Sequence, residues 1–176
     1  MKSIVAFLLL TLPLTAYTQD KKPTTLRGVL LEQLRTTHDQ KDWFVPINVA
    51  VEGLTAEQAS WTDGHGNHSV GQLANHMLFW NTDQLARFKG ETPPKYSGDN
   101  NETFNNFDTK KWSDTVHQLD QMMVAWEKAV ESADDQKLQE WASAIAHIGA
   151  HNAYHTGQII YIRRQQGSWD PEKGVK

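Results

Sequence analysis

The sequence predicts an all-α protein, a four-helix bundle with a long loop between the second and third long helices. Four long segments repeat their apolar residues at helical spacing, and no segment shows the sustained alternation of a strand. A chain of 176 residues has room for one domain with one sizeable core, and its apolar content and charge are ordinary for a folded soluble protein. We therefore expect a single helical domain.

The N-terminal residues are expected to lie outside this domain, as a signal peptide over residues 1–18. A lysine precedes an apolar run over residues 4–14, and Ala16 and Thr18 supply the small residues of a cleavage site. The run is too short for a comfortable membrane span, and no cysteine follows it to carry a lipid. We expect an exported protein, periplasmic or secreted, with the bundle over residues 19–176 and no stable membrane anchor after signal removal. A buried or amphipathic N-terminal helix is the alternative.

The first long helix is expected to run from near Thr25 to about Trp43. Pro46 should bend or interrupt it. The β-branched residues of segment 47–51 could form a short strand, but their position between Pro46 and Gly53 favours a kinked helix end. The apolar face of this first helix consists of leucines: Leu26, Leu30, Leu31 and Leu34.

Two capping boxes predict the next helix starts. Thr55 with Gln58 opens a short turn of helix, and Ser69 with Gln72 opens the second long helix, for which Gly90 is the stop. A surface loop is expected over residues 91–108, where prolines, a glycine and asparagines interrupt any helical period. Its aromatic residues are expected to order part of it: Tyr96, Phe104 and Phe107.

The third and fourth long helices show the clearest apolar seams. The fourth ends near Gln166, and two of its seam positions hold Asn152 and His155 where the pattern calls for leucine or isoleucine. The third seam comprises Trp112, Val116, Leu119, Met123, Trp126 and Val130. The fourth comprises Trp141, Ile145, Ile148, Asn152, His155, Ile159 and Ile162.

The histidines of the fourth helix predict a metal site. His151 and His155 are one helical turn apart, so both imidazoles can point at one ion. His147 continues the row but lies roughly 80° from the seam, which makes it a supporting or surface residue. His76 flanks the apolar stripe of the second helix and is the candidate third ligand. Its polar neighbours Asn75 and Asp83 are the alternatives there.

The ligand types restrict the ion. The chain has eight histidines and no cysteine, so any metal site must be built from imidazole and carboxylate. Three neutral imidazoles suit a divalent transition metal, with zinc or nickel preferred and iron possible, better than magnesium or calcium. Three protein ligands leave a position for water or substrate, which is typical of catalytic sites. The alternative is that the histidines of this group are core residues that form hydrogen bonds and bind no metal.

Three strings of the sequence resemble the DinB-like superfamily of metal-binding four-helix bundles. They are HNAYHTGQI at residues 151–159, SVGQLANHMLFWN at residues 69–81 and THDQKDWFVP at residues 37–46. The resemblance covers most of the chain beyond the signal peptide. It implies a bundle with a three-histidine metal site, whose ligand positions are occupied by His76, His151 and His155.

The resemblance implies several activities, because characterised relatives include thiol-dependent S-transferases and a mycothiol-dependent isomerase, and many members are described as metal-dependent hydrolases. Export lowers the weight of the transferase hypothesis, since low-molecular-weight thiols are scarce outside the cytoplasm. The main hypothesis is an exported, hydrolase-like, metal-dependent enzyme acting on a small molecule. The alternatives are a thiol-dependent S-transferase, a non-catalytic metal-binding or small-molecule-binding module, and a structural or interaction protein, for example a homodimer.

The chain is mildly acidic and carries further polar residues that could support a metal site. A formal net charge of −4 without any basic block argues against binding to nucleic acid. Several residues are candidates for supporting or acid–base roles at the metal: His38, Asp39, Asp42, Asn75, Asn81, Tyr154 and Gln158. Solvated or capping positions are the alternative for His38 and Asp39, and helix packing for Tyr154 and Gln158. The histidines expected at the surface are His65, His68 and His117.

Overall fold

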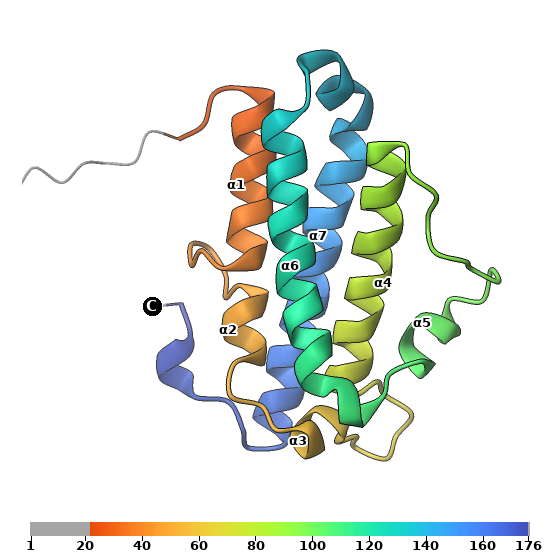
Figure 1. Cartoon of the computed structure of the whole chain (residues 1–176). Coiled ribbons are helices and arrows are strands. Elements are labelled where there is room, and N and C mark those ends of the chain that lie inside the picture. Colours follow the sequence, from red (N-terminus) through yellow and green to blue (C-terminus); the bar gives the residue numbers. More distant parts are fainter. Residues whose placement is uncertain (1–21, 176) are drawn as a thin grey trace, which may run out of the picture.

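The computed structural model describes residues 22–175, so the expected signal peptide lies outside the described residues. Four long helices build a bundle, which confirms the predicted all-α fold (Figure 1). These helices are α1 (Leu26–His38), α4 (Val70–Lys89), α6 (Trp112–Ser132) and α7 (Asp135–Gln165). The shorter elements are α2 (Ile47–Val51), α3 (Ala56–Ser60), α5 (Asn101–Asn105) and two 3₁₀ turns, η1 (Thr109–Lys111) and η2 (Pro171–Lys173).

The order of the helices explains the long connection. Each of α1 and α4 packs against both α6 and α7. In Figure 1, α1 and α7 run downward whereas α4 and α6 run upward, so the chain must cross the length of the bundle between α4 and α6. Residues 90–111 make this crossover. The sequence predicted it as a loop, but part of it is helical, because α5 and η1 lie within it.

Helix ends follow the predicted caps. The side chains and backbones of Thr55 with Gln58, and of Ser69 with Gln72, form reciprocal capping boxes. Gly90 closes α4 at φ 75°, in the left-handed region that favours glycine. These local signals were sufficient to place the starts of α3 and α4 and the end of α4.

The first long helix is shorter than the sequence suggested. It ends at His38 and not near Trp43, because no apolar residue follows Leu34 at helical spacing and residues 39–42 are polar and exposed. The chain then resumes helical structure after Pro46, as α2. Segment 47–51 is therefore a short helix, as expected, and not a strand.

The apolar core consists of two clusters, one toward each end of the bundle. The lower cluster in Figure 1 joins α2, α3 and α5 to the first halves of α4 and α6 and the last turns of α7. The upper cluster joins α1 to the second halves of α4 and α6 and the first half of α7. Asn81 and Asn152 are fully buried where α4 and α7 pass between the clusters. Each amide nitrogen donates to the other amide's oxygen, at 2.8 Å from Asn81 and 3.2 Å from Asn152.

This amide pair accounts for the polar residue in the seam of α7. Asn152 faces Asn81 across the bundle, and the second donor position of Asn81 is satisfied by the carbonyl of Met77 at 2.8 Å. Asn81, a candidate for a supporting role at the metal, thus makes its hydrogen bonds within the core.

Among the described residues, none of the helices is both long enough and apolar enough to cross a membrane.

Candidate metal centre

His76, His151 and His155 meet between α4 and α7. One ligand atom from each side chain lies within 4.8 Å of the others. The Nε2 atom of His151 is 3.0 Å from Nε2 of His76 and 3.1 Å from Nε2 of His155. The three ligand candidates from the sequence are therefore brought together, and as a group they could hold a metal ion.

The helices supply this geometry. His151 and His155 are one turn apart on α7, which places both rings on one face, with centroids 4.4 Å apart. His76 lies in the middle of α4, the helix that packs against this part of α7. His76 and His155 are buried and His151 is half-buried. Rigid elements thus hold all three rings largely out of water.

Thr103 fixes the tautomer of His76. The Thr103 hydroxyl donates its one hydrogen to the carbonyl of Asn100, at 2.7 Å. Its Oγ1 atom must therefore accept the hydrogen bond that joins it to Nδ1 of His76 at 2.6 Å. The hydrogen of the neutral ring is on Nδ1, and the lone pair of Nε2 faces the other two imidazoles.

Gln158 fixes the tautomer of His155 in the same way. Nδ1 of His155 is 2.6 Å from Oε1 of Gln158, and an amide oxygen only accepts. The amide is oriented by its nitrogen, which donates to the hydroxyl of Tyr154 at 3.2 Å. Of the two candidates for supporting roles on α7, Gln158 orients a ligand candidate directly, and Tyr154 acts on it through Gln158.

The Nε2 atoms of the three histidines need a shared partner. Nε2 of His151 faces two acceptors, the lone pairs on His76 and His155, and a single N–H cannot serve both well. A cation shared by the three Nε2 atoms satisfies all of them. The donor set therefore fits a metal ion.

The electrostatics keep the rings neutral. Burial, together with the nearby positive charge that a protonated His155 would carry, lowers the pKa of His76 to about 3 and that of His151 to about 4. Burial also lowers the pKa of His155. At neutral pH the three imidazoles are therefore unprotonated, the form that binds metals.

The short helix α5 covers the histidines from the crossover. The ring of Phe104 stacks on His76 with centroids 3.9 Å apart, and His68 stacks on the opposite face of Phe104, also at 3.9 Å. His68, expected at the surface, is only partly exposed for this reason. Thr103 was not among the candidates from the sequence, because a five-residue helix has too few turns to show a period. In the crossover, only the aromatic residues Tyr96, Phe104 and Phe107 indicated that part of the segment is ordered.

A cavity of about 490 Å³ opens over the three imidazoles. Small-molecule sites commonly measure roughly 300–1,000 Å³, so this space suits a small ligand. Apolar and aromatic side chains from α4, α5 and α7 make most of its wall. The residues that line it besides the three histidines are Trp80, Gln84, Asn100, Phe104, Ala144, His147, Ile148 and Tyr154.

His147 lies on this wall but outside the group of three. It is exposed, and its Nδ1 atom is 2.8 Å from the carbonyl oxygen of Ser143, one turn earlier on α7. This position agrees with the angular argument that removed it from the ligand set. His65 and His117 are exposed, as expected.

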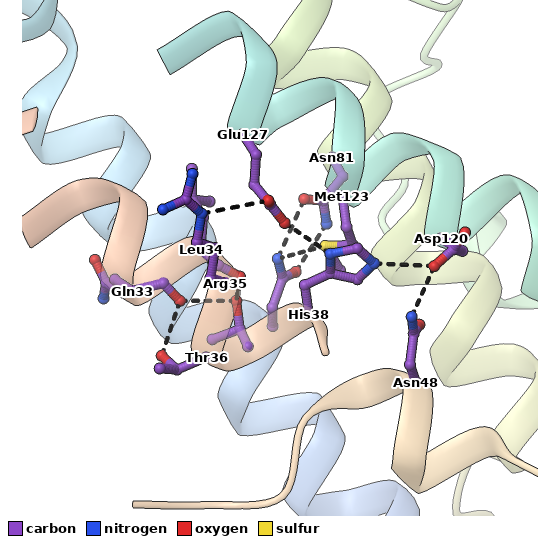
Figure 2. Close-up of polar contacts among 12 residues, drawn as sticks. Gln33, Leu34, Arg35, Thr36, His38, Asn48, Asn81, Asp120, Met123 and Glu127 are labelled. Carbon is purple, nitrogen blue, oxygen red and sulfur yellow. Dashed lines mark hydrogen bonds and ion pairs between the residues drawn. The ribbon is translucent and has the colours of Figure 1, made fainter. Parts of the chain in front are cut away.

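His38 has a different environment from the one expected. It is 3% exposed, with Nδ1 at 2.7 Å from Oε1 of Glu127 and Nε2 at 2.9 Å from Oδ1 of Asp120 (Figure 2). Burial lowers the pKa of His38, but the two carboxylates outweigh it and hold the pKa above its ordinary value. His38 therefore takes neither the supporting role at the metal for which it was a candidate nor the alternative solvated or capping position, and it ties α1 to α6. Asp39 is the exposed C-cap residue of α1.

The polar alternatives for the third ligand have other partners. Asn75 donates to the backbone carbonyl of Thr103 at 2.6 Å and so helps to place α5. The buried carboxylate of Asp83 accepts from the guanidinium of Arg87 at 2.8 and 3.1 Å. Asp42 is exposed in the segment after α1. None of the three belongs to the histidine group.

Comparison with known proteins adds a family match. A family model described as the DinB superfamily matches residues 47–159. The matched segment extends from α2 into the second half of α7 and contains His76, His151 and His155. No curated protein and no solved structure matches the chain significantly.

Proposed function

This chain belongs to the DinB superfamily, and we propose that its three histidines hold a divalent transition metal with which the protein hydrolyses a small molecule. The observation that supports the proposal is the convergence of three Nε2 atoms: that of His151 lies 3.0 Å from Nε2 of His76 and 3.1 Å from Nε2 of His155. Zinc or nickel fits an all-imidazole donor set best, and iron(II) is compatible with it.

The chain's own residues have separable tasks. His76, His151 and His155 hold the ion, while Thr103 and Gln158 keep hydrogen on the Nδ1 atoms and so leave the Nε2 lone pairs available. A bound divalent ion supplies Lewis acidity, which acidifies water and polarises a carbonyl or phosphoryl oxygen.

The cavity supplies the second requirement, a place for the substrate beside the imidazoles. Its apolar and aromatic side chains give a bound substrate a surface to pack against beside the imidazoles. In the proposed reaction the oxygen of water bonds to the acyl carbon. The bond from that carbon to the leaving oxygen or nitrogen breaks, and the leaving group takes up a proton.

We further propose that the protein acts outside the cytoplasm. The support is the sequence of residues 1–18, with its charged start, apolar run and small-residue cleavage site. Fractionation of cells that express the full chain, followed by N-terminal sequencing of the mature protein, tests this point. Recovery of uncleaved protein in the cytoplasm would contradict it.

Metal analysis tests the site itself. The protein is purified without a histidine tag and without added metal, stripped with a chelator, and titrated with zinc and with nickel. We expect one ion per chain and a rise in the free energy of unfolding of about 2.7 kcal/mol at a free metal concentration near 100 times Kd. His155→Ala should abolish uptake. His147→Ala, which removes an imidazole from the same helix, should leave uptake unchanged, and the reverse pattern would refute the ligand assignment.

Turnover separates the classes of function. The metal-loaded protein is offered ester, amide and phosphoester panels, with and without an added low-molecular-weight thiol. A hydrolase turns over one panel with metal alone. A requirement for the thiol would indicate the S-transferase activity instead, and tight metal binding with no turnover of any panel would indicate a binding module.

A further inference from the structure

The cavity over the histidines has an uncharged wall. Charged residues make up 22% of the chain, yet within the described residues 22–175 no aspartate, glutamate, lysine or arginine lines this cavity. Two other cavities differ: the one between α2 and α6 is lined by Glu52 and Asp120, and the one beside α1 by Glu32, Arg35 and other charged residues. The cavity between α4 and α6 is uncharged as well. The lack of charge is therefore shared by the two cavities along α4 and is not a property of the whole surface.

The nearest charges on α4 neutralise each other. Asp83 is buried and forms an ion pair with Arg87 at 2.8 Å, and Gln84 donates to the same carboxylate at 3.0 Å. Of these three residues only Gln84 lines the cavity. A charged ligand group would find neutral amides and imidazoles at this end of the wall, but no opposite charge.

The apolar part of the wall is held in place before any ligand arrives. The indole of Trp80 donates to the side-chain oxygen of Asn100 at 3.2 Å, and Tyr96 packs against its ring at a centroid distance of 5.3 Å. Phe104 is held between His68 and His76. Fixed aromatic faces of this kind bind flat apolar groups with little loss of conformational freedom.

We propose that the part of the substrate inside this cavity is an uncharged aromatic or branched apolar group, joined to a neutral ester or amide that lies at the three histidines. The proposal rests on the proposed hydrolase function for the reacting group, but the preference for an uncharged group follows from the wall alone. An ionic group on the substrate would lose hydration there without gaining a partner, which is unfavourable.

The same wall disfavours the S-transferase alternative. A charged low-molecular-weight thiol would have to keep its ionised groups at the mouth of the cavity, near the exposed side chains of Tyr154 and His147, and could bring only its uncharged part to the histidines. Apart from the proposed metal ion, none of the described wall residues carries a charge that would pair with a carboxylate or an ammonium group.

Three matched probes test the inference: acetanilides with a para-methyl, a para-carboxylate or a para-aminomethyl group. Binding to the metal-free and to the zinc-loaded protein is measured by calorimetry and by NMR, through the indole N–H resonance of Trp80, assigned by its loss in Trp80→Phe. We expect the methyl probe to bind the metal-free protein at least about tenfold more tightly than either charged probe, and to keep that preference over the aminomethyl probe when zinc is bound. Equal or tighter binding of a charged probe to the metal-free protein, or no binding of any probe, would overturn the inference.

A pair of charge insertions at one wall position sharpens the test. His147 is exposed, bonds only within its own helix and lies outside the histidine group. His147→Lys should raise the affinity for the carboxylate probe, His147→Glu that for the aminomethyl probe, and His147→Gln should keep the native preference. If neither insertion shifts the preference, the probes bind elsewhere and the inference fails.

The binding results are independent of turnover. If zinc is not bound, or if no ester or amide is hydrolysed, but the metal-free protein still prefers the methyl probe, the hydrolase function fails while the inference about the wall stands. If hydrolysis is found but charged substrates are turned over as readily as matched neutral ones, the inference fails and the function stands.

Discussion

Asn81 and Asn152 set the height of α7 against α4 by exchanging two hydrogen bonds in the middle of the core. Asn152 follows His151 directly, and Asn81 lies little more than one turn after His76. A shift of either helix along its axis would break the amide pair and would also separate the imidazoles. The amide pair therefore fixes the axial position of α4 relative to α7, and with it the relative positions of the three histidines.

Removing one amide of this pair should destabilise the protein. Asn81→Leu and Asn152→Leu each leave the partner amide buried without the two hydrogen bonds of the pair, at a cost of about 1–3 kcal/mol in the free energy of unfolding. The double variant removes both polar groups and should recover most of that loss. Urea denaturation of the metal-free proteins gives the double-mutant cycle. Gln139→Leu, at an exposed position of α7, is the control and should change stability by less than about 0.5 kcal/mol.

Thr103 should determine metal affinity without contacting the ion. Thr103→Val keeps the shape of the side chain but removes the oxygen that accepts from Nδ1 of His76. We expect zinc affinity to fall by about 10–100-fold, as for other groups that orient a ligand, and Thr103→Ser to restore it. Competition with a chelating dye measures the affinity. Thr82→Val removes a similar hydroxyl from α4, one bonded only to the carbonyl of Leu78, and should leave affinity unchanged. An equal loss in both variants would mean that the effect is one of stability.

His38 should make stability depend on pH. Because its pKa is raised in the folded state, the folded protein binds this proton more tightly than the unfolded chain. The stabilisation is fully present below the unfolded value of about 6.5 and is lost as the pH rises through the folded pKa. His38→Gln should thus lose about 1.5–3 kcal/mol at low pH and progressively less at higher pH.

Urea denaturation of the two proteins at a series of pH values tests the role of His38, with the difference between them as the readout. Taking this difference cancels the contribution of the three ligand histidines, whose pKa values are lowered and which give the opposite slope. A difference that grows with rising pH would show that His38 is neutral between Asp120 and Glu127.

Two helical glycines should respond to alanine in opposite directions. A Cβ atom at Gly71 would collide with the ring of Phe107, so Gly71→Ala should cost about 1–3 kcal/mol of stability. A Cβ atom at Gly157 meets nothing within 4 Å, and Gly157→Ala should stabilise the protein by about 0.4–1 kcal/mol through helix propensity and a less flexible unfolded chain. Thermal and chemical denaturation measure both. Destabilisation by Gly157→Ala would indicate that this face of α7 is covered in solution.

The bundle and the ligand candidates could be predicted from the sequence because both depend on regular spacing of residues. Capping boxes at Thr55 and Ser69 are read from residues three apart, and the seams of α6 and α7 repeat over many turns. His151 and His155 follow from the same helical period. His76 was predicted as the third ligand from its position beside the apolar stripe of the second long helix, together with the family resemblance.

Contacts between distant segments could not be predicted in this way. Thr103 reaches His76 from the crossover, and Asp120 and Glu127 reach His38 from α6, and none of these pairs has a spacing that marks it in the sequence. The end of α1, by contrast, can be predicted from the local pattern, because the apolar stripe stops at Leu34 and residues 39–42 are polar.

The crossover between α4 and α6 divides the protein into parts that evolution can change separately. The three histidines lie on two long helices whose spacing is set by the core, whereas Phe104 and Asn100 come from the connection between α4 and α6. Surface connections tolerate insertions and substitutions that a core helix does not. Changes within residues 91–100 would alter the cavity wall through Asn100 and through the packing of Tyr96 on Trp80, while the three histidines keep their places on α4 and α7.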